Sequence, residues 1–170
     1  LASRGLEDVV ATQSAISSII GATLTYRGIT IEELAENASF EEVVYLLWYG
    51  ALPTADQLRD FTTQIRQNLN PPAEVVGFLR QFPKHALQMD VLRTAVSMLG
   101  LYDPDVTDPS REANERKAIR LLAQMPALVT TYHRYRTGQE PVVFRPDLDI
   151  AGNFLYQLHG KMPNDREQHI

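Results

Sequence analysis

Residues 39–54, with the sequence SFEEVVYLLWYGALPT, contain two helix starts and one helix stop. Two residue pairs there have the spacing of a capping box, in which a side chain at the helix start and one three residues later each accept a hydrogen bond from the other residue's backbone N–H. These pairs are Ser39 with Glu42 and Thr54 with Gln57. Gly50 is a typical helix C-cap, and Pro53 cannot continue a helix. The stretch therefore predicts a short, almost entirely apolar helix with fixed ends, followed at once by another helix.

The residues before this stretch favour strands and turns. The segments VVATQSAISSII and ATLTYRG are rich in β-branched residues and meet at Gly21, which predicts a small β-hairpin. We expect this part to end at Gly28. From residue 31 onward the patterns are helical. The sequence thus predicts a mainly α fold with a small N-terminal β-hairpin, divided into residues 1–30 and residues 31–170.

Capping residues, and apolar residues at spacings of three and four, predict further helices. They cover residues 30–38, 54–69, 72–82, 89–99, 111–137 and 149–158. Gly100 is a good C-cap for the helix of residues 89–99, and Gly138 stops the helix that precedes it. Pro126 lies inside a helix, where it removes a backbone donor and clashes with the preceding turn, so we expect a kink or two abutting helices. In the helix of residues 89–99, the apolar face expected to point inward consists of Leu92, Ala95, Val96 and Leu99. Asp149 is expected to cap the last helix, whose inward apolar residues are Ile150, Phe154, Leu155 and Leu158.

The final residues, KMPNDREQHI, begin like another helix at Pro163 but supply a single apolar residue, Ile170. The pattern fits truncation of a longer chain and a natural polar tail equally well. Truncation would leave apolar helix faces without their partners, so it predicts exposed apolar surface or self-association.

Composition excludes several classes of protein. The net charge of -5 argues against a nucleic-acid-binding protein, which usually carries a basic face. The absence of cysteine excludes a disulfide scaffold, a thiol nucleophile and cysteine-based metal sites. No apolar run approaches the ~18 residues of a membrane span, and the N-terminus lacks the apolar centre of a signal peptide. We therefore expect a soluble, cytoplasmic protein that binds neither nucleic acid nor membrane.

No metal site is predicted from the histidines or the carboxylates. The histidines are His85, His133, His159 and His169. No two of them have the i, i+4 spacing of a helical metal site, and we interpret each as structural or solvent-facing. The carboxylate pairs Glu32 with Glu33 and Glu41 with Glu42 fall in helix first turns, where negative charge complements the helix dipole. Asp103, Asp105 and Asp108 lack the glycine and distal glutamate of an EF-hand calcium loop.

The sequence also lacks a complete catalytic constellation. Ser14, Ser17 and Ser18 have no GxSxG motif around them, and no glycine-rich phosphate loop is present. One cluster combines basic and aromatic side chains: Tyr132, Arg134, Tyr135 and Arg136. We interpret it as a helix C-terminus, where positive charge is favoured; the alternative is a contact with an acidic cofactor or a partner subunit. No residue is predicted to be catalytic, and the substrate-binding residues are unknown from the sequence.

Several stretches, taken in order, resemble the N-terminal part of bacterial citrate synthases, including the related 2-methylcitrate synthases. They are GLEDVVATQSAISSI, LTYRGITIEELAENASFEEVVYLLWYGALPT, MDVLRTAVSMLGLYDPD, EANERKAIRLLAQMPALV, YHRYRTGQEP and NFLYQLHG. Single motifs such as YRG are weak, but the ordered set covers nearly the whole chain. The resemblance implies the multi-helical large domain of that family, truncated at its C-terminus.

The resemblance also implies an acyltransferase that condenses oxaloacetate with acetyl-CoA to citrate and CoA in the tricarboxylic acid cycle. In that family the subunits form homodimers, no metal or cofactor is used, and an aspartate and two histidines carry the chemistry. These residues lie downstream of the NFLYQLHG-type segment, so the isolated chain is expected to be inactive. The alternatives are a 2-methylcitrate synthase that uses propionyl-CoA and a non-enzymatic helical association module.

Two structural expectations follow from the resemblance. The family usually has a His-Pro pair just before the methionine of HALQMD, where this chain has Leu87 and Gln88, and loss of the proline should alter the turn into the helix. The apolar helix of residues 40–49 would belong to the large domain's scaffold and be buried on several sides. Tyr45 and Trp48 are then core or interface residues.

Overall fold

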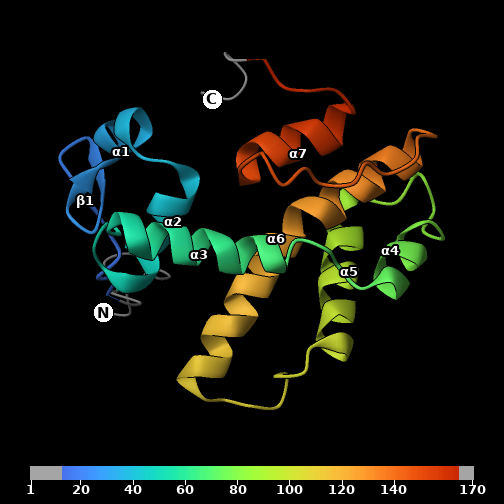
Figure 1. Ribbon diagram of the computed structural model, residues 1–170, viewed down its shortest axis with the longest axis horizontal. Coiled ribbons are helices and arrows are strands. Elements are labelled where there is room, and N and C mark those ends of the chain that lie inside the picture. Colours follow the sequence, from blue (N-terminus) through green and yellow to red (C-terminus); the bar gives the residue numbers. More distant parts are fainter. Residues whose placement is uncertain (1–12, 165–170) are drawn as a thin grey trace, which may run out of the picture. The chain divides into compact units, whose positions relative to one another are not determined.

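The structure is a computed structural model that describes residues 13–164 (Figure 1). The chain divides into two compact units, residues 1–58 and residues 59–170. The described residues form three short strands, all in the first unit, and seven helices. This confirms the predicted mainly α fold with a small N-terminal β element. The division at residue 30 stays a prediction.

The first unit begins with a three-stranded antiparallel sheet. Its elements are β1 (Ser17–Ile20), β2 (Thr23–Tyr26), β3 (Ile29–Thr30), α1 (Ile31–Asn37) and α2 (Phe40–Tyr49). β1 and β2 form the predicted hairpin around Gly21, which has a φ of 66°. The strands do not end at Gly28, because β3 adds to β2 and pairs Thr30 with Thr25. Arg27 and Gly28 connect β2 to β3 with φ angles of 50° and 88°, the conformation of a two-residue hairpin turn.

Both ends of α2 are fixed by hydrogen bonds. The Ser39 backbone N–H donates to Glu42 Oε2 at 2.7 Å, and the Glu42 N–H donates to Ser39 Oγ at 3.3 Å, which completes the predicted capping box. Gly50 ends the helix with a φ of 87°. The last turn has no basic residue of its own, but Arg27 Nη2 donates to the Leu47 carbonyl at 2.9 Å. The turn between β2 and β3 thus supplies the cation that stabilises the negative end of α2.

α2 is less buried than its composition predicts. Val44 and Leu46 are buried, whereas Trp48 is 36% exposed and Tyr49 is also exposed. Tyr45 is half-buried, with its ring centroid 4.4 Å from that of Tyr49. α2 is therefore not buried on several sides within the described chain, and the expectation that Tyr45 and Trp48 are core or interface residues of the whole large domain stays a prediction.

The next helix, α3 (Ala55–Gln67), begins with the second predicted capping box. The Thr54 N–H donates to Gln57 Oε1 at 2.8 Å, and the Gln57 N–H donates to Thr54 Oγ1 at 3.3 Å. Phe61 and Ile65 are buried, as the apolar stripe predicts. The second unit continues with α4 (Ala73–Leu79), α5 (Gln88–Tyr102), α6 (Arg111–Arg136) and α7 (Ile150–His159).

Helices α4, α5 and α6 share the core of the second unit (Figure 1). The core consists of Val75, Leu79, Val91, Ala95, Leu99, Leu128 and Tyr132. The predicted inward face of α5 missed Val91, while Leu92 and Val96 are only half-buried. The Tyr132 hydroxyl donates to the Pro83 carbonyl at 2.8 Å. This hydrogen bond holds the turn after α4 against α6.

The end of α5 differs from the prediction. Gly100 is not a C-cap, because the helix continues through Tyr102 and ends at Asp103. Asp103 precedes Pro104, and a residue before proline is disfavoured in the helical conformation. At the start of α5, Leu87 is the N-cap residue and its side chain makes no capping hydrogen bond. At the C-terminal end of α5, Pro104 therefore determines the helix boundary more strongly than Gly100 does.

α6 is a single helix in spite of Pro126, which excludes two abutting helices. In Figure 1 its ribbon changes direction about halfway along, which fits the predicted kink. A Schellman motif closes the helix, as Gly138 predicted: the Gln139 N–H donates to the Arg134 carbonyl at 2.8 Å, and the Gly138 N–H to the Tyr135 carbonyl at 3.2 Å.

The buried side of α7 combines the apolar Ile150 with polar side chains. Asn153 and Gln157 are buried, whereas three of the four predicted apolar residues, Phe154, Leu155 and Leu158, are half-buried. Asp149 caps the helix as predicted and accepts from the Gly152 N–H at 2.7 Å. The Asn153 amide group donates to the carbonyls of Arg145, Leu148 and Asp149. With Gln157, which donates to the Val142 carbonyl at 3.2 Å, it holds the extended connection between α6 and α7 in place.

Candidate functional site

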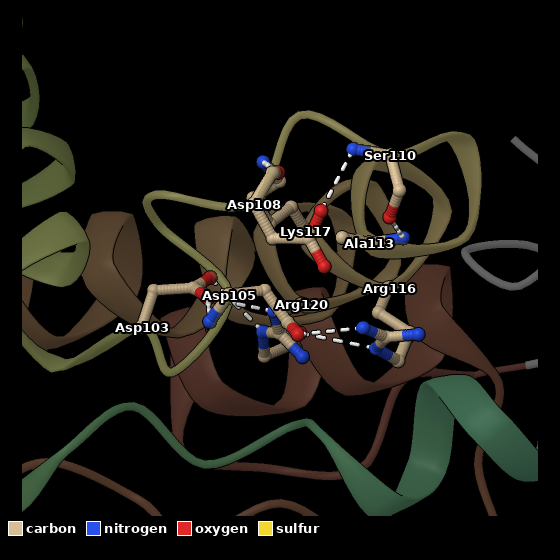
Figure 2. Close-up of polar contacts among 8 residues, drawn as sticks. All are labelled: Asp103, Asp105, Asp108, Ser110, Ala113, Arg116, Lys117 and Arg120. Atoms are coloured by element: carbon tan, nitrogen blue, oxygen red, sulfur yellow. Dashed lines mark hydrogen bonds and ion pairs between the residues drawn. The ribbon is translucent and has the colours of Figure 1, made fainter.

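Two aspartates and two arginines join the loop after α5 to the first half of α6 (Figure 2). Arg120 donates to both Asp103 oxygens, at 2.7 and 3.0 Å, and to Asp105 Oδ2 at 2.6 Å. Arg116 donates to both Asp105 oxygens, at 2.6 and 3.1 Å. We call these four residues the aspartate–arginine array. Its two bidentate pairs fix the loop on the helix, because the planar guanidinium matches the carboxylate geometry.

The array favours the charged form of Asp105. Hydrogen bonds from Arg116 and Arg120 hold the pKa of Asp105 well below its usual range. The backbone N–H and hydroxyl of Ser110 lower the pKa of Asp108 in the same way. The side chains of Asp103 and Asp105 are only 15% and 16% exposed. Contacts with arginine and with the start of α6 thus give the aspartates of this loop a structural role.

The histidines lie on different elements of the fold. His85 follows α4, His133 lies on α6 and His159 ends α7, and all three are exposed, in agreement with the solvent-facing interpretation. His169 lies outside the described residues. Among residues 13–164, no group of three or more His, Asp and Glu side chains could hold a metal ion. None of the helices in that range is both long and apolar enough to cross a membrane.

The structure separates the basic and aromatic residues at the C-terminus of α6 into two kinds. Tyr132 is buried in the core, and Arg134 Nε donates to the Glu140 carbonyl at 2.6 Å. Arg134 also lies against Gly160, where a Cβ atom would come within 2.9 Å of Arg134 Nη1. These two residues therefore have the structural role that the sequence favoured.

Tyr135 and Arg136, together with part of Tyr132, line a pocket of about 230 Å³. We call it the α6 C-terminal pocket; its polar lining comes from Arg80, Lys84, Tyr135, Arg136, Gln139 and Glu140. Arg80 pairs with the Glu140 carboxylate, and its guanidinium lies 5.2 Å from the centre of the Tyr135 ring. Sequence reasoning missed Arg80 and Lys84, because they are far from α6 in the chain and only the turn after α4 brings them to it. The pocket presents mainly hydrogen-bond donors, which suit an anionic group.

Comparison with known proteins agrees with this fold. A family model described as citrate synthase, C-terminal domain, matches residues 5–170. "Citrate synthase 2" of Bacillus subtilis is 47% identical over 98% of this chain, and "2-methylcitrate synthase 1" of Corynebacterium glutamicum is 42% identical over 92% of it. The crystal structure of citrate synthase from Pyrobaculum aerophilum superposes with a TM-score of 0.88 at 36% identity, over 96% of this chain.

The helical fold and these matches define a protein of the citrate synthase type. The chain belongs to the citrate synthase family, as the ordered stretches predicted. It spans 45%, 42% and 44% of the lengths of the three proteins just compared. Which portion of the family's large domain it corresponds to stays a prediction, and so does the expectation that it contains no catalytic residue.

Proposed function

We propose that the protein of which this chain is part condenses oxaloacetate with acetyl-CoA, giving citrate and CoA as in the tricarboxylic acid cycle. The observation that carries the proposal is the family match over residues 5–170, together with 47% identity to a citrate synthase over nearly the whole chain. The expected chemistry is proton abstraction by a positioned base with electrostatic stabilisation of the developing enolate. No metal or cofactor takes part in the proposed reaction.

The catalytic base and the two histidines are proposed to lie outside this chain. The exposure of His85, His133 and His159 is consistent with this, because none of the three lies in a water-excluded site. The 170-residue chain should therefore be inactive, and the longer protein active. Release of the CoA thiol from acetyl-CoA in the presence of oxaloacetate measures both. Turnover by the 170-residue chain would refute the placement of the catalytic residues, and an inactive longer protein would refute the enzyme.

A 2-methylcitrate synthase that uses propionyl-CoA is a second candidate. It is favoured by the similarity to "2-methylcitrate synthase 1" of Corynebacterium glutamicum, at 42% identity. The ratio of kcat/KM for acetyl-CoA and propionyl-CoA, measured on the longer protein with oxaloacetate, decides between the two. A preference for propionyl-CoA would replace the first proposal by the second.

We further propose a cytoplasmic homodimer. Support comes from apolar side chains that α5 leaves uncovered: Met89 is 72% exposed and Leu101 is 81% exposed, and Leu87 and Tyr102 are exposed as well. Light scattering of the longer protein should give twice the mass of one chain. A monomer without dye-accessible apolar surface would contradict the dimer.

A non-enzymatic association module is the remaining alternative. A reading frame that continues beyond Ile170 into histidine-containing segments favours the enzyme, whereas a stop codon directly after Ile170 favours the module. Sequencing the transcript therefore separates the two independently of any assay.

A further inference from the structure

We propose that the α6 C-terminal pocket binds the phosphate group of a small molecule. The proposal is independent of the condensation reaction, because it concerns donors that the pocket leaves unused. Within residues 13–164, the side chains of Lys84 and Arg136 have no hydrogen bond or ion pair, and neither do the Tyr135 hydroxyl and the Gln139 amide. Apart from Glu140, which is paired with Arg80, the charged side chains of the pocket are cations, and such a set of donors is suited to an anion.

The end of α6 does not itself use these donors. The carbonyls of the last turn are already occupied: those of His133, Arg134 and Tyr135 accept from the backbone N–H groups of Thr137, Gln139 and Gly138. The Thr137 hydroxyl adds hydrogen bonds to the His133 and Arg134 carbonyls, at 2.9 and 3.0 Å. Arg136 is therefore not needed as a C-cap, unlike an arginine at an unsatisfied helix end.

The neighbouring charges leave the pocket positive. Arg80 and Glu140 neutralise each other in their ion pair, and Arg134 is directed at the Glu140 and Leu158 carbonyls. Lys84 and Arg136 then remain as two uncompensated charges in a chain whose net charge is -5. Arg136 is half-buried, so it is less hydrated than a fully exposed arginine and binds an anion at a smaller desolvation cost.

The size of the pocket agrees with this ligand class. One water molecule takes up about 30 Å³ in the liquid, so the pocket of about 230 Å³ has room for a phosphate or a diphosphate. A guanidinium can bind two phosphate oxygens at once, and an ammonium group adds a point charge. The phosphate could come from a free polyphosphate or from CoA, and the experiment separates the two.

Titration of the 170-residue chain with pyrophosphate, followed by calorimetry and by amide NMR shifts, tests the proposal. Saturable binding is expected, with shifts at residues 135–140. Lys84→Gln and Arg136→Gln should each weaken binding about tenfold, since each removes a charge-assisted hydrogen bond. The matched control is Arg66→Gln, which removes the same charge from an exposed position on α3. Acetate at equal concentration controls for non-specific screening of charge.

Three outcomes decide the matter. Binding of pyrophosphate that is weakened only by the two pocket variants supports the site, and a further preference for CoA over pantetheine identifies CoA as the phosphate source. Equal effects of Lys84→Gln, Arg136→Gln and Arg66→Gln would show that any positive charge suffices and would overturn the proposal. Absence of saturable binding would overturn it as well. Circular dichroism shows whether Arg136→Gln disturbs folding. If it does, Lys84→Gln still tests the site, because Lys84 is exposed and its replacement should leave the fold intact.

Discussion

The arginines at the two ends of α6 differ in whether they have acidic partners. At its first half, Arg116 and Arg120 are fully engaged by two aspartates of the preceding loop. At its last turn, Arg136 lines a pocket and makes no hydrogen bond or ion pair among the described residues. Both regions combine arginines with polar neighbours on one helix, and residue type alone does not distinguish them. The difference is whether acceptors reach the arginine from the rest of the chain: the first arrangement stabilises the fold, and the second is available to a ligand.

Removal of Arg120 should have the largest effect on stability. Arg120→Met leaves the largely buried Asp103 and Asp105 without their shared partner, so the free energy of unfolding should fall by about 2 kcal/mol. Urea denaturation measures this loss. Arg93→Met, which removes an exposed arginine from α5, is the control and should change stability by less than about 0.5 kcal/mol. Equal losses in the two variants would show that the array does not stabilise the loop.

Acid should weaken the first half of α6 next. The pKa of Asp105 is lower in the folded than in the unfolded chain, so its contribution is complete above the unfolded value and is lost as pH falls below about 4 toward the folded value. Urea unfolding between pH 6 and pH 3 should show a declining free energy. Asp105→Asn removes the titrating group and should flatten the decline; an unchanged slope in this variant would assign the acid sensitivity to other carboxylates.

Arg134 provides the corresponding test at the other end of the helix. Arg134→Gln removes the hydrogen bond to the Glu140 carbonyl and the contact with Gly160, so we expect a loss of about 1 kcal/mol in urea denaturation. If the free energy of unfolding is unchanged, the connection after α6 is held by the side-chain amides of Asn153 and Gln157 alone.

Arg136 should show the smallest effect of all. Because it has no partner among the described residues, Arg136→Gln should change the free energy of unfolding by less than about 0.5 kcal/mol. Urea denaturation measures this change, and the result can be compared directly with that of Arg134→Gln, because the two arginines lie within one turn of α6. A loss as large as that of Arg134→Gln would mean that Arg136 has a structural role, and the contrast between the two ends would fail.

The features that the sequence predicted correctly are local ones. The capping boxes at Ser39 and Thr54, the Asp149 cap and the stop at Gly138 each depend on residues within one turn. The Gly100 prediction failed because a glycine also fits inside a helix, and the residue before Pro104 determines the boundary. Family membership was also predictable, because the ordered stretches are long.

Features that need distant partners were not predictable. Asp103 and Arg120 meet across a loop whose path the pattern does not give. Lys84 lines the same pocket as Arg136 only because α4 packs on α6. Asn153 was overlooked for a similar reason: a polar residue is buried there because its amide binds carbonyls of the extended connection. The spacing of apolar residues does not predict the burial of a polar side chain that is held inside by hydrogen bonds.

Pro126 has a consequence for how the two ends of α6 open to solvent. It contributes no backbone N–H, so the Leu122 carbonyl lacks its intrahelical donor and the amide ladder is divided into two runs. Amides in each run should exchange with deuterium through their own local fluctuations. Fraying near Ser110 would then leave the protection of the run near Arg134 unchanged.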